Sequence, residues 1–173
     1  MLLVLTAVTG VSVALLAYVN ELTKEPIAQA NAKTLNEALK SVVPAFTNNA
    51  VSECDTIFSE KDGKKIVDFI IYPAKNGEET VGTAVEAKSM GFGGELKILV
   101  GFDADGKIYN YSLLAHAETP GLGSKAADWF KEGNKGSIKG LNPGEKQLAV
   151  SKDGGQVDAI TASTITSRAF LNA

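Results

Sequence analysis

Five hydroxyl side chains are crowded into the seven positions from Thr161 to Ser167, close to the last residue of a 173-residue sequence. Where such a run begins a helix, its hydroxyls and its free backbone N–H groups form a site for a phosphate-like anion, because the N-terminal end of the helix dipole is positive. Arg168 follows directly and would add a positive charge. The alternative is structural, either a Thr-rich strand or a helix N-cap with spare hydroxyls. The residues alone leave both interpretations open.

A second segment with potential chemistry is His116 to Gly123, which reads HAETPGLG. Pro120 fixes its own φ and the two glycines adopt conformations that other residues avoid, so the second half predicts a turn. His116 and Glu118 would share one face of a strand that reached this far. A single histidine beside a carboxylate is more often a structural hydrogen bond than an acid–base pair. We therefore assign no catalytic residue.

Composition excludes several classes of protein. The net charge of -3 and the pI near 5.2 argue against a nucleic-acid partner, which requires a concentrated basic face. Cys54 is the only cysteine and His116 the only histidine. An internal disulfide, a structural zinc site and a haem attachment motif are therefore excluded, and we expect no metal site. The sequence also lacks a Walker loop, a Rossmann GxGxxG and a nucleophile elbow.

The residues from Leu2 to Val19 are free of charge, and a segment of this length is near the minimum that crosses a bilayer as a helix. A cleaved signal peptide is the alternative, but it needs a basic start and a small-x-small cleavage site, and neither is evident. We therefore expect a retained anchor. The first positive charges, Lys24, Lys33 and Lys40, follow the span, so the positive-inside rule alone favours a cytoplasmic domain.

The rest of the chain predicts alternating helices and strands. Apolar residues at three- and four-residue spacing predict a helical stalk over Leu22–Val43, with a possible break at Pro26. Runs rich in β-branched and aromatic residues predict four strands, of which the last two form a hairpin across an Asp-Gly turn: Lys65–Tyr72, Thr80–Ala87, Leu96–Asp103 and Ile108–Ala115.

Shorter elements follow the hairpin. We expect a short helix over Ala126–Phe130, a strand over Val157–Ile160 and a terminal helix that begins at Thr164 or Ser167. The fold class is α+β, with one N-terminal transmembrane helix and then an antiparallel domain. The predicted organisation is an anchor at 1–21, a helical stalk at 22–44 and the α+β domain at 45–173.

The anchor, the GFGGELKILVGFDADGKI segment, HAETPGLGSK and DAITASTITSRAF, in this order, resemble one known family. It is the FMN-binding domain shared by the G subunit of the Rnf complex and the C subunit of the Na⁺-translocating NADH:quinone reductase. The length is nearer that of the compact Rnf subunit.

The resemblance implies the roles of particular residues. The family motif reads approximately Ser/Thr-Gly-Ala-Thr-x-Thr-Ser, and its first Thr after Gly-Ala is esterified to the phosphate of FMN. This places the covalent FMN on Thr164, with Thr166 as a rival acceptor, and Ala162 stands where the family has Gly. The other cofactor-binding residues implied are Thr161 and Ser163 beside the acceptor and Glu118, Thr119, Gly121 and Leu122 as a ledge for the flavin ring.

The resemblance also implies the function. The chain would be an electron-carrying flavoprotein subunit of an Rnf-type, ion-translocating ferredoxin:NAD⁺ oxidoreductase in the cytoplasmic membrane, beside membrane and iron–sulfur subunits, with FMN attached by a separate Mg²⁺-dependent flavin transferase that uses FAD. Against the lysine bias, it implies an extracytoplasmic domain. Two alternatives remain: the corresponding subunit of the quinone reductase or of an extracellular electron-transfer chain, and a cofactor-free assembly module.

Overall fold

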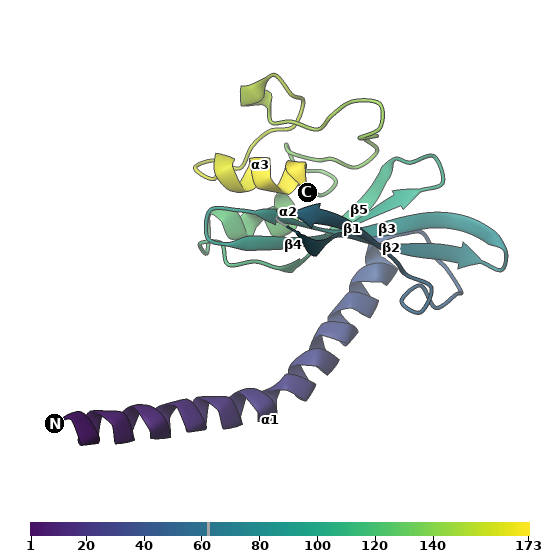
Figure 1. The fold of residues 1–173 in the computed structure, drawn as a ribbon. Helices are drawn as coiled ribbons and strands as arrows, with labels where there is room; N and C mark the ends of the chain where they lie inside the picture. The colour runs from purple at the N-terminus through teal and green to yellow at the C-terminus, as the bar shows by residue number, and fades with distance from the viewer. Residues whose placement is uncertain (62) are drawn as a thin grey trace. The chain divides into compact units, whose positions relative to one another are not determined.

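The computed structural model describes residues 1–61 and 63–173, which form two compact units, 1–35 and 36–173. Five strands build one sheet, with helices before and after it (Figure 1). The elements in chain order are α1 (Leu2–Val42), β1 (Asp55–Lys61), β2 (Lys64–Asn76), β3 (Glu79–Met90), β4 (Glu95–Asp103), β5 (Ile108–Ala115), the 3-10 turn η1 (Gly123–Lys125), α2 (Ala126–Trp129), the 3-10 turn η2 (Ser151–Asp153) and α3 (Thr164–Asn172).

α1 contains both the predicted anchor and the predicted stalk in one helix. It runs through Pro26 without interruption, so the possible break at this residue is not found. Its first part is long and apolar enough to cross a membrane, with a mean hydropathy of 2.3 and no burial within the protein. The hydroxyls of Thr6 and Thr9 donate hydrogen bonds to Leu2 O and Leu5 O at 3.0 and 2.9 Å. Both hydroxyls therefore have an acceptor within the helix and would not be left unpaired in an apolar environment.

The sheet is a meander in which each strand pairs only with its neighbours in sequence, always antiparallel. The four predicted strands are therefore confirmed, although β2 and β3 extend beyond their predicted ends. At the β4–β5 turn Gly106 has a φ of 76°, the positive value expected of the Asp-Gly pair. The α+β fold class is confirmed.

Two predictions at the level of elements differ from the structure. β1 was not predicted, because this edge strand has a β-bulge between Ile57 and Phe58 that interrupts the apolar–polar alternation. The predicted strand Val157–Ile160 is wrong. Only Val157 forms a bridge, to Val150. The Asp158 carbonyl instead accepts a hydrogen bond from the Trp129 indole, at 2.8 Å.

α2 and α3 lie over one face of the sheet (Figure 1), and the core lies between them and β4–β5. Phe130 and Phe170 stack with their ring centroids 4.3 Å apart, and Tyr111 meets Phe170 edge to face at 4.8 Å. The Tyr111 hydroxyl donates to the Ala126 carbonyl at 2.6 Å, and burial raises the pKa of this phenol. This cluster fixes α3 on the sheet and so sets the position of its first turn.

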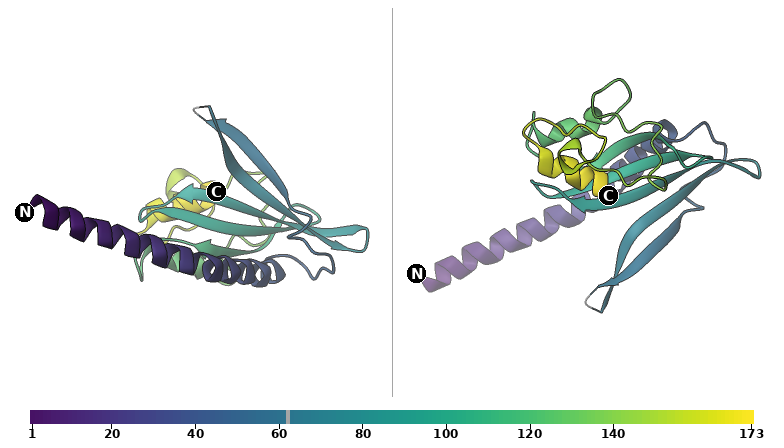
Figure 2. Two further views of the ribbon diagram at one scale, coloured as in Figure 1. Left: turned by 60° about the horizontal axis from the view of Figure 1, so that its bottom comes forward. Right: turned by 90° about the horizontal axis from the view of Figure 1, so that it is seen from above.

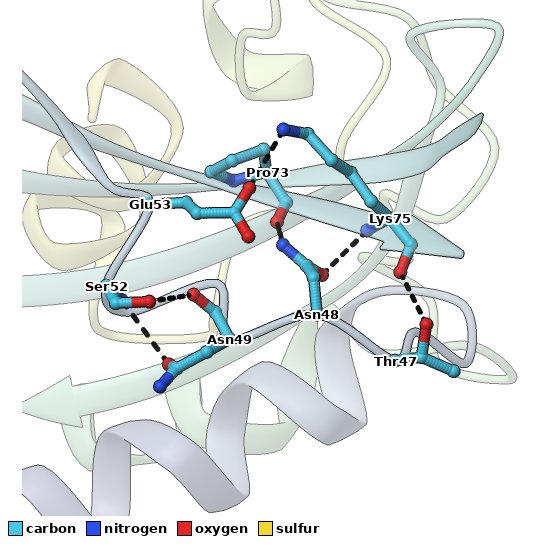
Figure 3. Close-up of polar contacts among 7 residues, drawn as sticks. All are labelled: Thr47, Asn48, Asn49, Ser52, Glu53, Pro73 and Lys75. Atoms are coloured by element: carbon cyan, nitrogen blue, oxygen red, sulfur yellow. Dashed lines mark hydrogen bonds and ion pairs between the residues drawn. The ribbon is translucent and has the colours of Figure 1, made fainter. Parts of the chain in front are cut away.

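The opposite face of the sheet is covered by the last turns of α1, from Asn36 onward. Leu39 and Val42 are fully buried there, and Gly101 of β4 leaves room for them, because a Cβ at this glycine would collide with the Val42 carbonyl. The following loop is tied to the end of β2: Asn48 bonds to both Pro73 and Lys75, and Glu53 pairs with Lys75 at 2.8 Å (Figure 3).

The β1–β2 hairpin extends beyond the rest of the sheet (Figure 2) and exposes apolar side chains. Where it leaves the sheet, an apolar cavity of about 550 Å³ opens between β2–β4 and the last residues of α3. The sheet face under the hairpin therefore lacks the cover that α2 and α3 give to β4 and β5.

Candidate functional site

The hydroxyl-rich segment forms the start of α3. The helix begins at Thr164, which is one of the two starting positions predicted from the sequence. Thr164 is the first residue of the helix, and Ser163 precedes it as the N-cap residue without a side-chain cap hydrogen bond. The first N–H groups of a helix have no carbonyl partner within it. Since the Ser163 hydroxyl does not take one of them, these donors and the positive end of the dipole remain available to an anion.

The hydroxyls of this segment differ in what they already bond. Thr166 donates to Glu118 Oε2 at 2.7 Å, and Ser167 donates to the Ser163 carbonyl at 3.0 Å while it accepts from the Ile160 N–H at 2.9 Å. Thr164 is half-buried, and its hydroxyl has no partner within residues 1–61 and 63–173. Of the two predicted acceptors, Thr164 is therefore the one with a free oxygen.

A cavity of about 420 Å³ lies in front of this helix start. Its volume is within the range of small-molecule sites. The lining combines apolar side chains with hydroxyls and comes from three segments: Phe92, then Glu118, Thr119, Leu122 and Gly123, then Ala162, Ser163, Thr164, Ile165 and Thr166. Apolar walls for a flat ring and free N–H groups for an anion thus meet in one space.

Glu118 holds these three segments together. The residue is 5% exposed, yet its carboxylate has no ion pair among the described residues. Oε1 accepts the Gly93 N–H at 3.1 Å and Oε2 accepts the Thr166 hydroxyl at 2.7 Å. A turn after β5, a loop before β4 and the first turn of α3 are therefore joined through one side chain.

The other residues predicted in the ledge have different positions. Thr119 and Leu122 line the cavity, and both are exposed. Gly121 has a φ of 76°, which only a glycine adopts readily, but it does not line the cavity and shapes the turn instead. Thr161 is exposed and also lies outside the lining. Whether each of these residues binds a cofactor stays a prediction.

His116 and Arg168, also singled out in the sequence, are engaged elsewhere. His116 Nδ1 accepts the backbone N–H of Glu118 at 3.3 Å, whereas the Glu118 carboxylate bonds to Gly93 and Thr166. β5 ends at Ala115, so the two residues do not share a strand face. Arg168 makes two hydrogen bonds of 2.7 Å to Asp153, and this contact holds the pKa of the Asp153 carboxyl below its usual value. The guanidinium thus fastens α3 to η2 rather than facing the cavity.

Two features of the site were missed in the sequence. Phe92 is 71% exposed at the tip of a Gly-rich loop, where the Gly91 N–H bonds to the Gly94 carbonyl at 2.8 Å. Ile165 is 53% exposed on the first turn of α3. A large apolar residue between glycines in a bend was the available signal for Phe92. Among the described residues no cluster of His, Cys, Asp and Glu could hold a metal ion.

Two protein-family models match this chain, one near each end. The family model of the FMN-binding domain matches residues 91–173, and that of the RnfG N-terminal region matches residues 3–42. The G subunit of the ion-translocating oxidoreductase complex of Yersinia pestis is 34% identical over 92% of this chain and 78% of that protein. Proteins of the same name from Shewanella loihica and Escherichia coli K12 are 36% and 32% identical, over 92% and 94% of this chain and 78% and 80% of theirs.

Proposed function

Because this chain belongs to the family of G subunits of ion-translocating oxidoreductase complexes, with an FMN-binding domain at residues 91–173, we propose that its FMN is joined by a phosphoester to Thr164. The observation that carries the proposal is the free Thr164 hydroxyl at the start of α3, on the wall of the cavity. The FMN-binding match includes every residue of that wall.

The residues present fit an esterified flavin phosphate. The N–H groups of the first turn of α3 would hold its remaining negative charge, and the hydroxyl of Ser163 is beside them. Phe92, Leu122 and Ile165 supply apolar surface for the isoalloxazine ring. Thr166 is disfavoured as the acceptor because the residue is 1% exposed and its hydroxyl donates to Glu118.

The attachment requires a flavin donor and a transferase. The Thr164 hydroxyl replaces AMP on the FMN phosphoryl group of FAD: its Oγ–P bond forms, the pyrophosphate bond breaks, and AMP and the hydroxyl proton leave. We propose that the separate Mg²⁺-dependent transferase supplies the catalytic groups for this step. The tether keeps the flavin at a high local concentration.

The bound flavin supplies electron transfer, and the chain supplies its position and its electrostatic surroundings. We propose that the complex is a ferredoxin:NAD⁺ oxidoreductase of the Rnf type, in which membrane and iron–sulfur subunits exchange electrons with this one. α1 would anchor the chain in the cytoplasmic membrane. The soluble domain would lie on the extracytoplasmic side, since partners readily orient a single span with few flanking charges.

Coexpression with the flavin transferase tests the attachment. Mass spectrometry is expected to find one FMN on the peptide that contains Thr164, and fragmentation is expected to assign it to Thr164 rather than to Ser163 or Thr166. Thr164→Ala should abolish the in-gel flavin fluorescence, whereas Thr80→Ala, an exposed threonine of β3, should retain it. An unmodified wild-type chain, or FMN on another residue, contradicts the proposal.

A further inference from the structure

We propose that Glu118 is a positioning residue for flavin attachment: its buried carboxylate fixes the Phe92 loop against the first turn of α3 and thereby orients the Thr164 hydroxyl. The inference depends on the proposed function, because it concerns the same site. It assigns Glu118 to the protein framework around the flavin rather than to the surface that touches the ring.

The hydrogen bonds of Glu118 support this assignment. Its two carboxylate oxygens face two different segments, the Gly93 N–H on one side and the Thr166 hydroxyl on the other. The donor residues lie 25 positions before and 48 positions after Glu118 in the chain. Thr166 is also two residues from the proposed acceptor, on the same turn of α3. A shift of Thr166 therefore moves Thr164 with it.

The space around the carboxylate is fitted to it. A Cβ at Gly91 would collide with Oε1, and a Cβ at Gly123 would collide with both Oε2 and the Thr166 hydroxyl. These two positions admit only glycine while the carboxylate stays where it is. Side chains on either would displace Glu118 or the helix, so the packing as well as the hydrogen bonding holds α3 in place.

The chemistry of a carboxylate is needed here, and an amide is not equivalent. A carboxylate accepts at both oxygens, whereas Gln has one acceptor oxygen and one NH₂ donor. In Glu118→Gln the NH₂ would have to face either the Gly93 N–H or the Thr166 hydroxyl. Facing Gly93 it would set donor against donor. Facing Thr166 it can donate to the hydroxyl oxygen, but a neutral hydrogen bond then replaces the stronger charge-assisted one that Thr166 donates to the carboxylate, so the clamp is weakened although size and shape are kept.

The same clamp sets the position of Phe92. The Gly93 N–H that bonds Glu118 belongs to the residue that follows Phe92, so the bond holds the loop tip beside the cavity. A weaker bond would let the Phe92 side of the cavity move, together with the first turn of α3. Because the neutral amide of Glu118→Gln accepts more weakly than a carboxylate, its attached flavin is expected to move more than that of the wild type.

The test compares flavin attachment to purified full-length chains by the transferase with FAD and Mg²⁺, well below their unfolding temperatures. Three variants are informative: Glu118→Gln, Thr166→Val, which removes the hydroxyl donor, and Thr166→Ser, which keeps it. Glu95→Gln is the matched control, because Glu95 is exposed at the start of β4. The readouts are kcat and KM for the chain, and the fluorescence anisotropy of the attached flavin.

We expect Glu118→Gln and Thr166→Val to lower kcat by about tenfold or more, because small misplacements of a reacting group have such effects. The KM should change less than kcat, and the anisotropy should fall. Thr166→Ser should recover most of the rate. A purely structural role would lower the unfolding temperature and leave the rate and anisotropy of the folded chain unchanged.

Wild-type kcat and anisotropy in folded Glu118→Gln would overturn the inference, as would a Thr166→Val variant that equals Thr166→Ser. If Glu118→Gln does not fold, the two Thr166 variants decide the question alone. Failure of the proposed function looks different, since the wild-type chain itself would then acquire no flavin on Thr164.

Discussion

Ala162, two residues before the proposed flavin acceptor, has a φ of 61° and is the one non-glycine with a positive φ among the described residues. For an alanine this left-handed conformation costs on the order of 1–2 kcal/mol. Glycine would adopt it freely, and the family motif has glycine here. The strain is therefore local to the loop that presents Thr164.

Ala162→Gly should relieve this strain. The greater entropy of glycine in the unfolded chain offsets about 0.4–1 kcal/mol of this gain, so we expect a net increase of about 0–1.6 kcal/mol in the free energy of unfolding. Denaturant unfolding measures it. Ala159→Gly is the control, because Ala159 has an ordinary negative φ and its replacement should destabilise the fold. A clear loss of stability in Ala162→Gly would contradict the role of strain.

Individual residues of the site could be predicted only where the signal is local. The hydroxyl run predicted a helix that begins at Thr164 or Ser167, and α3 begins at the first of these. The contact between Glu118 and Thr166 joins residues 48 positions apart and could not be read from spacing. Arg168 shows the same limit, since its partner Asp153 lies on a turn that the sequence did not mark.

Among the elements, α3 depends on its attachment to η2 as well as on its apolar face. The Asp153–Arg168 pair joins them, with both side chains partly exposed. The hydrogen bond from Arg168 lowers the pKa of Asp153 from 3.8. A lowered carboxyl pKa stabilises the folded state above the unfolded value, and this contribution is lost as the pH falls through the folded value.

Asp153→Asn should therefore lower the melting temperature at neutral pH and make no difference once Asp153 is protonated. We expect the gap between wild type and variant to close as the pH falls below 3.8. Thermal unfolding followed by circular dichroism from pH 7 downward measures it. Asp105→Asn, on the exposed β4–β5 turn, should show no such gap. A gap that persists at the lowest pH would exclude the ion pair as its cause.

The strands could be predicted to the extent that burial imposes a pattern on them. β4 and β5 are covered on both faces, and their apolar runs predicted their ends within a residue. β1 is a bulged edge strand without such a pattern. The segment Val157–Ile160 has the apolar composition of a strand, but the Trp129 indole and the Ser167 hydroxyl take backbone groups that a neighbouring strand would have used.

For the whole molecule, the compact unit 36–173 holds the complete sheet and the proposed flavin site, and the unit 1–35 holds the apolar span. Two signals about the side of the membrane conflict, because the lysines after the span and the family resemblance point in opposite directions. Nothing in the packing of either unit depends on that choice.

Protease treatment of spheroplasts tests the proposed extracytoplasmic side. Trypsin added to intact spheroplasts should degrade the soluble domain of this protein. Lys65, on the exposed β1–β2 hairpin, is among the accessible cleavage sites. A cytoplasmic marker protein should survive in the same sample. Protection of the domain until the membrane is lysed would place it in the cytoplasm and contradict the proposal.

The meander also bears on the order of events during biosynthesis. Because each strand pairs only with the one made just before or after it, the five strands can assemble from short loop closures while synthesis continues. α3 follows all of them in the chain. The nascent sheet can therefore be complete before Thr164, the proposed acceptor, has left the ribosome, and attachment of flavin at this residue would be a late step of maturation.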